Sequence, residues 1–193
     1  MGERESADGE ARLTRRDALA ALASAGIVVG GAGALTWRSL RGTDEAPAFS
    51  STDRRTLEAI ARVVYPSVAE NVGEFVETYV VGRIQDRPEY AASVRDAVAD
   101  LDESARYWED ESFADLDPAT GSGLLESLGI DQVEADPDGD DAERIRFYLV
   151  NELLFAFYAS PTGGELLGIE NPPGYPGGTR SYQRGPDEPD GRR

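Results

Sequence analysis

The sequence contains no cysteine and no histidine, and every one of its 19 basic residues is arginine. The missing residue types exclude disulfides, thiolate nucleophiles, Cys/His zinc sites, Cys-ligated iron–sulfur clusters, covalently attached haem and Ser-His-Asp triads. An enzyme of this composition would have to use carboxylates, hydroxyls, tyrosines and arginines, whereas accessory and binding proteins need nothing more. The length of 193 residues suggests one domain with tails.

Positive charge is also scarce, because 37 acidic residues give the chain a net charge of −18. The acidic excess lies entirely after residue 42. It argues against nucleic acid as a partner, since phosphate binding needs a basic face. At molar salt the Debye length falls to about 3 Å, so such a surface is tolerated and aids solubility. The composition therefore predicts an extreme halophile, with an ordinary acidic protein from a GC-rich genome as the alternative.

An uncharged run, residues 18–37, follows an arginine-containing start and precedes two further arginines. This order of basic, apolar and polar residues is that of an export signal. The pair Arg15 and Arg16, with Thr14 before it and Leu19 three places after it, resembles a twin-arginine signal. We therefore expect residues 1–41 to be a signal for the twin-arginine translocase, separate from the fold, and the rest to lie outside the cytoplasmic membrane.

The same run has a second interpretation, a permanent membrane anchor. Twenty helical residues reach about 30 Å, enough to cross the hydrocarbon core of a bilayer. Four glycines make the run only weakly apolar, and residues 32–34 (Ala-Gly-Ala) offer a cleavage site. The sequence leaves open whether the signal is cut or anchors the protein.

After a linker at 42–50, apolar residues recur at helical spacing and predict an all-α domain over 51–160. We expect a small bundle of about five helices, the first capped by Ser51 or Thr52 and the others at about 70–86, 88–109, 118–128 and 141–159. Trp108 falls on the apolar stripe of the third helix, which predicts a place in the core or in a partner contact. No alternating pattern of useful length predicts a strand.

The helix over 141–159 has little polar face, which predicts that it is central to the bundle or covered by a partner. Phe155 and Tyr158 on it are candidate partner contacts. Residues 161–184 are rich in glycine and proline and predict an extended strap over the helices, followed by a disordered tail at 185–193. Further strap or partner candidates are Gly174, Tyr175, Pro176, Gly177 and Gly178.

Two features could carry chemistry, and each has a plainer interpretation. The acidic loop 136–143 resembles a calcium loop, but its sixth and twelfth positions are Asp141 and Phe147, so the EF-hand spacing fails. We interpret it as a solvated loop and leave a loose cation site open. Glu152 could be a buried acid or base, or could occupy the wet edge of its helix. We predict no catalytic, cofactor-binding or metal-binding residue in this chain.

Three segments together carry a family resemblance. Residues 57–66 read Leu-Glu-Ala-Ile-Ala-Arg-Val-Val-Tyr-Pro, residues 158–168 read Tyr-Ala-Ser-Pro-Thr-Gly-Gly-Glu-Leu-Leu-Gly, and residues 172–178 read Pro-Pro-Gly-Tyr-Pro-Gly-Gly. With the arginine-pair signal, this order of segments resembles the gluconate 2-dehydrogenase subunit 3 family, the small subunit of membrane-associated flavoprotein dehydrogenases. The resemblance covers about residues 50–183.

The resemblance implies an accessory role without a cofactor in this chain. It implies a large partner subunit that contains FAD and is of the glucose–methanol–choline oxidoreductase type, in some cases with a cytochrome subunit. The small subunit would help to export or mature this sugar or alcohol dehydrogenase. Two alternatives remain at this stage: a free-standing cell-surface helical protein with a structural or weak cation-binding role, and a hydrolase that uses carboxylates.

Overall fold

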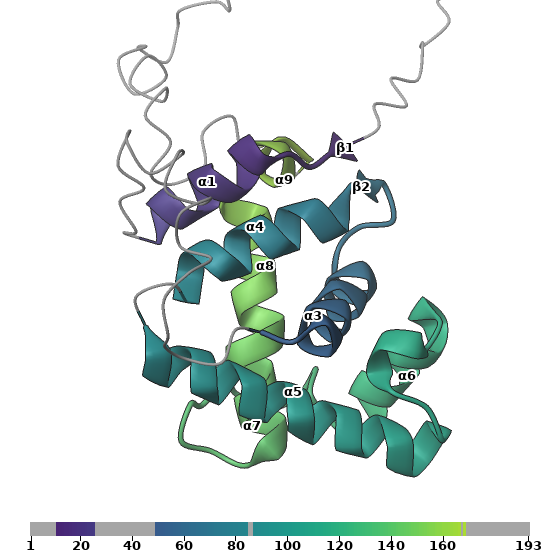
Figure 1. Cartoon of the computed structure of the whole chain (residues 1–193). Helices are drawn as coiled ribbons and strands as arrows, with labels where there is room; N and C mark the ends of the chain where they lie inside the picture. The colour runs from purple at the N-terminus through teal and green to yellow at the C-terminus, as the bar shows by residue number, and fades with distance from the viewer. Residues whose placement is uncertain (1–10, 26–48, 85–86, 167, 169–193) are drawn as a thin grey trace, which may run out of the picture.

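The computed structural model describes residues 11–25, 49–84, 87–166 and 168, and these form an all-α bundle (Figure 1). The predicted fold class is thereby confirmed. The only β structure in these ranges is a parallel bridge between two short strands, which pairs Ala11 with Ala69 and Arg12 with Glu70. The elements in chain order are β1 (Ala11–Arg12), α1 (Arg15–Ser24), α3 (Ser51–Val64), β2 (Ala69–Glu70), α4 (Val72–Ile84), α5 (Pro88–Glu109), the 3-10 turn η1 (Phe113–Asp115), α6 (Pro118–Ser127), α7 (Asp141–Ile145), the π-helical turn η2 (Arg146–Asn151), α8 (Glu152–Ala159) and α9 (Pro161–Leu166).

Local chemistry sets most helix starts. Pro88 and Pro118 each occupy the first turn of a helix, where the missing backbone N–H costs nothing. The side chain of Asp117 accepts hydrogen bonds from two backbone N–H groups of α6. The N-cap of α3 is Ser50, which forms a reciprocal capping box with Asp53, so the cap lies just before the predicted Ser51 or Thr52.

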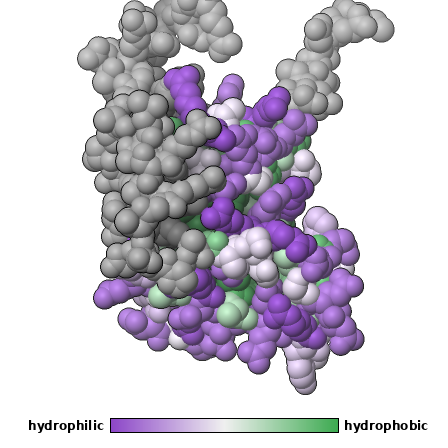
Figure 2. Space-filling model, in the orientation of Figure 1, coloured by the Kyte–Doolittle hydropathy of each residue, from purple (hydrophilic) through white to green (hydrophobic). Residues whose placement is uncertain are grey.

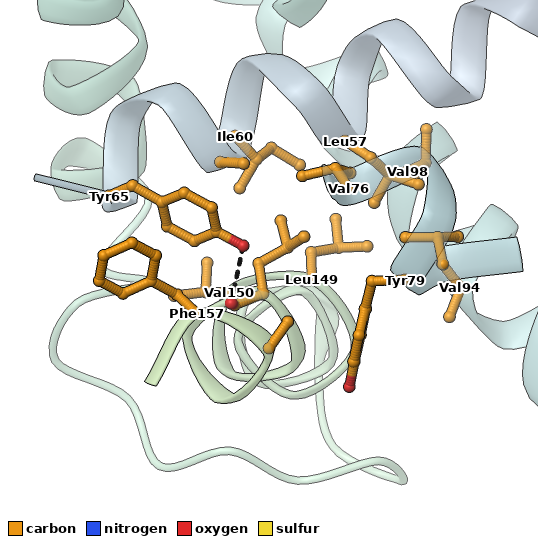
Figure 3. Close-up of a cluster of buried hydrophobic side chains, with 14 of the residues drawn as sticks. Leu57, Ile60, Tyr65, Val76, Tyr79, Val94, Val98, Leu149, Val150 and Phe157 are labelled. Carbon is orange, nitrogen blue, oxygen red and sulfur yellow. Dashed lines mark hydrogen bonds between the residues drawn. The ribbon is translucent and has the colours of Figure 1, made fainter. Parts of the chain in front are cut away.

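The predicted central helix lies where the sequence placed it. Leu149 on η2 and Phe157 on α8 are buried among side chains of α3, α4 and α5 (Figure 3). Leu153, between them in the sequence, is buried as well. The buried hydroxyl of Tyr65, just after α3, donates a hydrogen bond to the backbone carbonyl of Leu153 at 2.9 Å. This bond satisfies a phenol that would otherwise be costly to bury.

The central helix is not one regular α-helix. Residues 146–151 form the π-helical turn η2 between α7 and α8. A π turn carries i to i+5 hydrogen bonds and inserts one extra residue into the helical repeat. The turn therefore changes which side chains of α8 face the bundle.

Trp108 does not lie in the core. It is 65% exposed, because the last turn of α5 extends beyond the core, and its ring packs edge-on against the exposed Tyr107, with centroids 4.9 Å apart. Its other predicted place, a partner contact, stays a prediction. The predicted strap was wrong in its first residues. The segment after Ser160 does not begin as an extended strap. Ser160 is extended and ends α8, and Pro161 then starts the short helix α9, in which Gly163 and Gly164 are buried.

The N-terminal segment also departs from expectation, because residues 11–25 lie within the helical body (Figure 1). Leu13, Ala18, Ala21 and Leu22 have no exposed surface. Phe49, assigned to the linker, is buried as well. The folded body thus extends beyond 51–160 at both ends, and within the described residues no helix combines the length and the apolar character needed to cross a membrane. Only part of the uncharged run 18–37 falls within these ranges.

The outer surface agrees with the acidic composition. Hydrophilic residues cover most of the coloured face in Figure 2. Several acids lie in surface ion pairs such as Arg54 with Glu77 at 2.7 Å and Arg62 with Glu58.

Candidate functional site

The most concentrated group of polar side chains inside the body surrounds Glu152. One carboxylate oxygen, Oε1, accepts hydrogen bonds from the Tyr79 hydroxyl at 2.6 Å and from Nε of Arg83 at 2.5 Å. The other, Oε2, accepts one from the Tyr90 hydroxyl at 2.7 Å. The Glu152 and Arg83 side chains are 16% and 20% exposed. We call these four residues, from α4, α5 and α8, the Glu152 cluster.

Burial and charge set the ionisation of the two phenols in the cluster. Burial raises the pKa of Tyr79 far above its ordinary value, and the neighbouring carboxylate of Glu152 raises it further. The same two causes, burial first, raise the pKa of Tyr90. Both phenols therefore stay protonated at neutral pH and act as donors. Arg83 and Arg87 also lie over the Tyr90 ring, with 4.9 Å and 4.4 Å from guanidinium carbon to centroid.

The cluster is suited to holding helices together more than to chemistry. The cavity beside it has a volume of about 10 Å³, the size of one water at most. A second cavity, between α3 and α6, measures about 180 Å³, below the roughly 300 to 1,000 Å³ of typical ligand pockets. The carboxylate of Glu152 already has a donor on each oxygen. We assign it a structural role in joining α8 to α4 and α5.

Sequence reasoning found Glu152 but missed Tyr79, Arg83 and Tyr90. Tyr79 and Arg83 are four residues apart on α4, so they share one face of that helix. That spacing is visible in the sequence. Its meaning depends on which helix packs opposite, and the sequence does not state this.

The partner candidates on α8 lie on the surface. Phe155 is 43% exposed and Tyr158 is 39% exposed, and their spacing of three residues places them on one helix face. Leu166 on α9 is 40% exposed. Large apolar side chains that stay exposed on an otherwise hydrophilic protein are typical of protein contact sites. We call Phe155 and Tyr158 the α8 aromatic pair.

The acidic loop uses its carboxylates for local structure. Asp140 and Glu143 form the capping box of α7, and Asp136 accepts the backbone N–H of Asp138 at 2.9 Å. Among the described residues, no three acidic side chains are grouped so as to hold a metal ion. A loose cation site in this loop remains a hypothesis.

The remaining predicted residues divide into two groups. Arg15 and Arg16 are exposed at the start of α1, and Leu19 is half-buried on the same helix. The strap candidates fall outside the described residues: Gly174, Tyr175, Pro176, Gly177 and Gly178. The same is true of the predicted tail at 185–193.

Comparison with known proteins identifies the family. A family model described as gluconate 2-dehydrogenase subunit 3 matches residues 51–177, which includes every helix from α3 to α9 and begins after α1. Searches for similar curated proteins and similar solved structures found no match. Since the matched range spans more than half of the sequence, the chain belongs to the gluconate 2-dehydrogenase subunit 3 family, an accessory subunit of dehydrogenase complexes.

Proposed function

We propose that this chain is a noncatalytic, exported subunit that binds an FAD-dependent dehydrogenase of the glucose–methanol–choline type and helps to export or mature it. The FAD and the substrate would both be held by the partner. The twin-arginine translocase would carry the pair, with residues 18–37 as a signal or a membrane anchor. A cytochrome subunit could complete the complex.

The observation that carries this proposal is the α8 aromatic pair within a chain of this family. α8 is the most apolar helix of the body, yet Phe155 and Tyr158 remain exposed on it. Aromatic side chains contribute most of the affinity at many protein interfaces.

Copurification of the full-length tagged chain from its own cells at molar salt tests the proposal. The wild-type chain is expected to recover a large flavoprotein, identified by its flavin absorbance and by mass spectrometry. The double variant Phe155→Ala, Tyr158→Ala is expected to lose at least about 90% of this recovery, the effect of removing two interface anchors. Deletion of the gene should also leave the dehydrogenase inside the cell.

A matched control is the double variant Tyr107→Ala, Trp108→Ala, which removes the other exposed aromatic pair, on α5. It is expected to recover the flavoprotein normally. If the wild-type chain recovers no flavoprotein and its deletion leaves export unchanged, the proposed function is overturned. If only the control variant loses the partner, the partner binds at α5 and the assignment to α8 is wrong.

A further inference from the structure

The arginine-pair segment is bound to the folded body along its whole described length. Helix α1 lies across α4 and α8 and also contacts α9 (Figure 1). Its buried face consists of Ala18, Ala21 and Leu22, and Leu13 is buried just before it. We call the surface of α4, α8 and α9 that receives this helix the α1 site.

Polar contacts fix the start of the segment in the α1 site. The Asn71 side-chain amide donates to the backbone carbonyl of Leu13 at 2.9 Å, and the Leu13 N–H donates to the carbonyl of Glu70. The Asp17 carboxylate accepts the Thr14 N–H through one oxygen and the Thr162 N–H through the other, each at 2.9 Å. Asp17 therefore completes the capping box of its own helix, whose N-cap is Thr14, and also joins that helix to α9.

The α1 site is shaped to receive this helix. Gly82 on α4 faces Leu22, and a Cβ atom at position 82 would lie 2.3 Å from Cδ1 of Leu22. That distance is far inside van der Waals contact, so the two helices can approach this closely only because position 82 has no side chain.

The arginine pair itself stays accessible while the apolar face is hidden. The Arg15 side chain is 75% exposed, and its Nε lies 2.6 Å from Glu74. Arg16 is exposed beside it. The apolar run of the signal begins at Ala18, so the docked helix hides the first part of that run. Insertion of the run into a membrane and its binding to the α1 site are mutually exclusive.

We propose that the α1 site is an intramolecular receptor for the export signal, which withholds the signal's apolar segment from the membrane until α1 is released. This inference rests on the proposed export role. Helix α1 precedes residue 51, where the family match begins, so the docking of α1 in the α1 site is a feature outside the matched range. The same segment is either docked in the α1 site or released to the membrane. A change that raises the docked population is therefore expected to lower the rate of export in proportion.

Single-cysteine labelling of the full-length chain tests docking, since the natural sequence has no cysteine to remove. Ala21→Cys places a thiol on the buried face of α1, and Ala23→Cys places one on its exposed face. A maleimide is expected to react with Cys at position 21 at least about tenfold more slowly than at position 23, because buried sites react only after local opening. Equal rates in the intact protein would overturn the inference.

A substitution on the body side then releases the helix without changing the signal. Gly82→Leu fills the space of Leu22 with a residue that favours helix in α4. It is expected to raise the labelling rate at position 21 about tenfold and to speed export in cells. Gly123→Leu is the matched control, since a Cβ at position 123 meets nothing within 4 Å. If Gly82→Leu fails to fold, as circular dichroism would reveal, Leu22→Ala weakens the same contact from the α1 side.

The export arm separates this inference from the function on which it rests. Replacing Arg15 and Arg16 together by lysine is expected to stop export while leaving the slow labelling at position 21 intact. Unchanged export in that variant would overturn the proposed export role and leave docking standing. The labelling at position 21 could also be slow while neither Gly82→Leu nor Leu22→Ala accelerates export. That result would overturn the proposal that the α1 site withholds the signal, and it would leave the proposed function standing.

Discussion

The backbone N–H of Thr162 donates a hydrogen bond to the carboxylate of Asp17 at 2.9 Å, across 145 residues of sequence. The bond joins the first helix of the described body to its last. It also explains why the acid at position 17 is buried, with 4% of its surface exposed.

Replacing Asp17 by alanine removes one half of the α1 capping box and leaves the Thr162 N–H without its partner. We expect it to lower the free energy of unfolding by about 2 to 3 kcal/mol, measured by denaturant titration at constant salt. Asp53→Ala is the matched control, because Asp53 holds the same capping-box position in α3, where it is only half-buried and accepts an exposed hydrogen bond from the Ser50 N–H. Its expected cost is about 1 kcal/mol. Equal costs for the two variants would contradict a role for the long-range bond.

Glu152→Gln removes the charge that the Glu152 cluster is built around. Arg83, 20% exposed, then lacks a counter-ion. The expected loss of stability is about 2 to 3 kcal/mol, somewhat below that for fully buried pairs because some solvent screening remains. Glu58→Gln breaks the exposed pair with Arg62 and should cost no more than about 0.5 kcal/mol. A Glu152→Gln variant as stable as the wild type would show that the cluster is dispensable.

The buried tyrosines give a pH dependence with a definite sign. Burial raises the folded-state pKa of Tyr65, Tyr79 and Tyr90 above the ordinary 10.0. Their contribution is fully present below pH 10 and is lost as pH rises further, since only the unfolded chain ionises there. Stability should fall above about pH 10 by up to about 1.4 kcal/mol per pH unit for each tyrosine. Tyr65→Phe removes one of the three ionising groups and should reduce this slope by up to about 1.4 kcal/mol per pH unit. A free energy of unfolding that stays constant up to about pH 11 would contradict the raised pKa values.

The acidic surface predicts a dependence on salt. With a net charge of −18, repulsion between carboxylates opposes the compact state when ions are scarce. The thermal midpoint should rise steadily from about 0.1 M to about 2 M KCl as the Debye length shortens. A midpoint that is highest at low salt would argue for an ordinary acidic protein and against adaptation to high salt.

The sequence predicted those parts of the fold that local chemistry controls. Pro88 and Pro118 each precede a predicted helix, and each lies in the first turn of one in the structure. The apolar helix containing Leu153 is predicted to be central to the bundle or covered by a partner, and Leu153 and Phe157 on it are buried in the core. Trp108 shows the limit of periodicity, because a stripe does not say where the core ends and α5 continues beyond it.

The parts that could not be predicted depend on packing between distant segments. A weakly apolar run rich in alanine and glycine fits an export signal and also a helix that packs closely on its neighbours. The sequence pattern alone does not distinguish the two, and the arginine pair favours the signal, so the packing of α1 on the body is not predicted. Likewise, the partners of Glu152 come from residues 62 to 73 positions away. Only the meeting of α4, α5 and α8 brings them together.

The π-helical turn at residues 146–151 makes chain length in this segment matter for the Glu152 cluster. Each residue of an α-helix advances the chain by about 100° around its axis. Because the turn takes up one extra residue, a homologue that lacks this residue and winds as a regular α-helix would still present its glutamate to the tyrosines of α4 and α5. A homologue of the same length without the π turn would instead turn α8 by that angle relative to α7, and its glutamate would point away from them. A one-residue gap aligned to this turn therefore marks a relative whose bundle is joined in the same way.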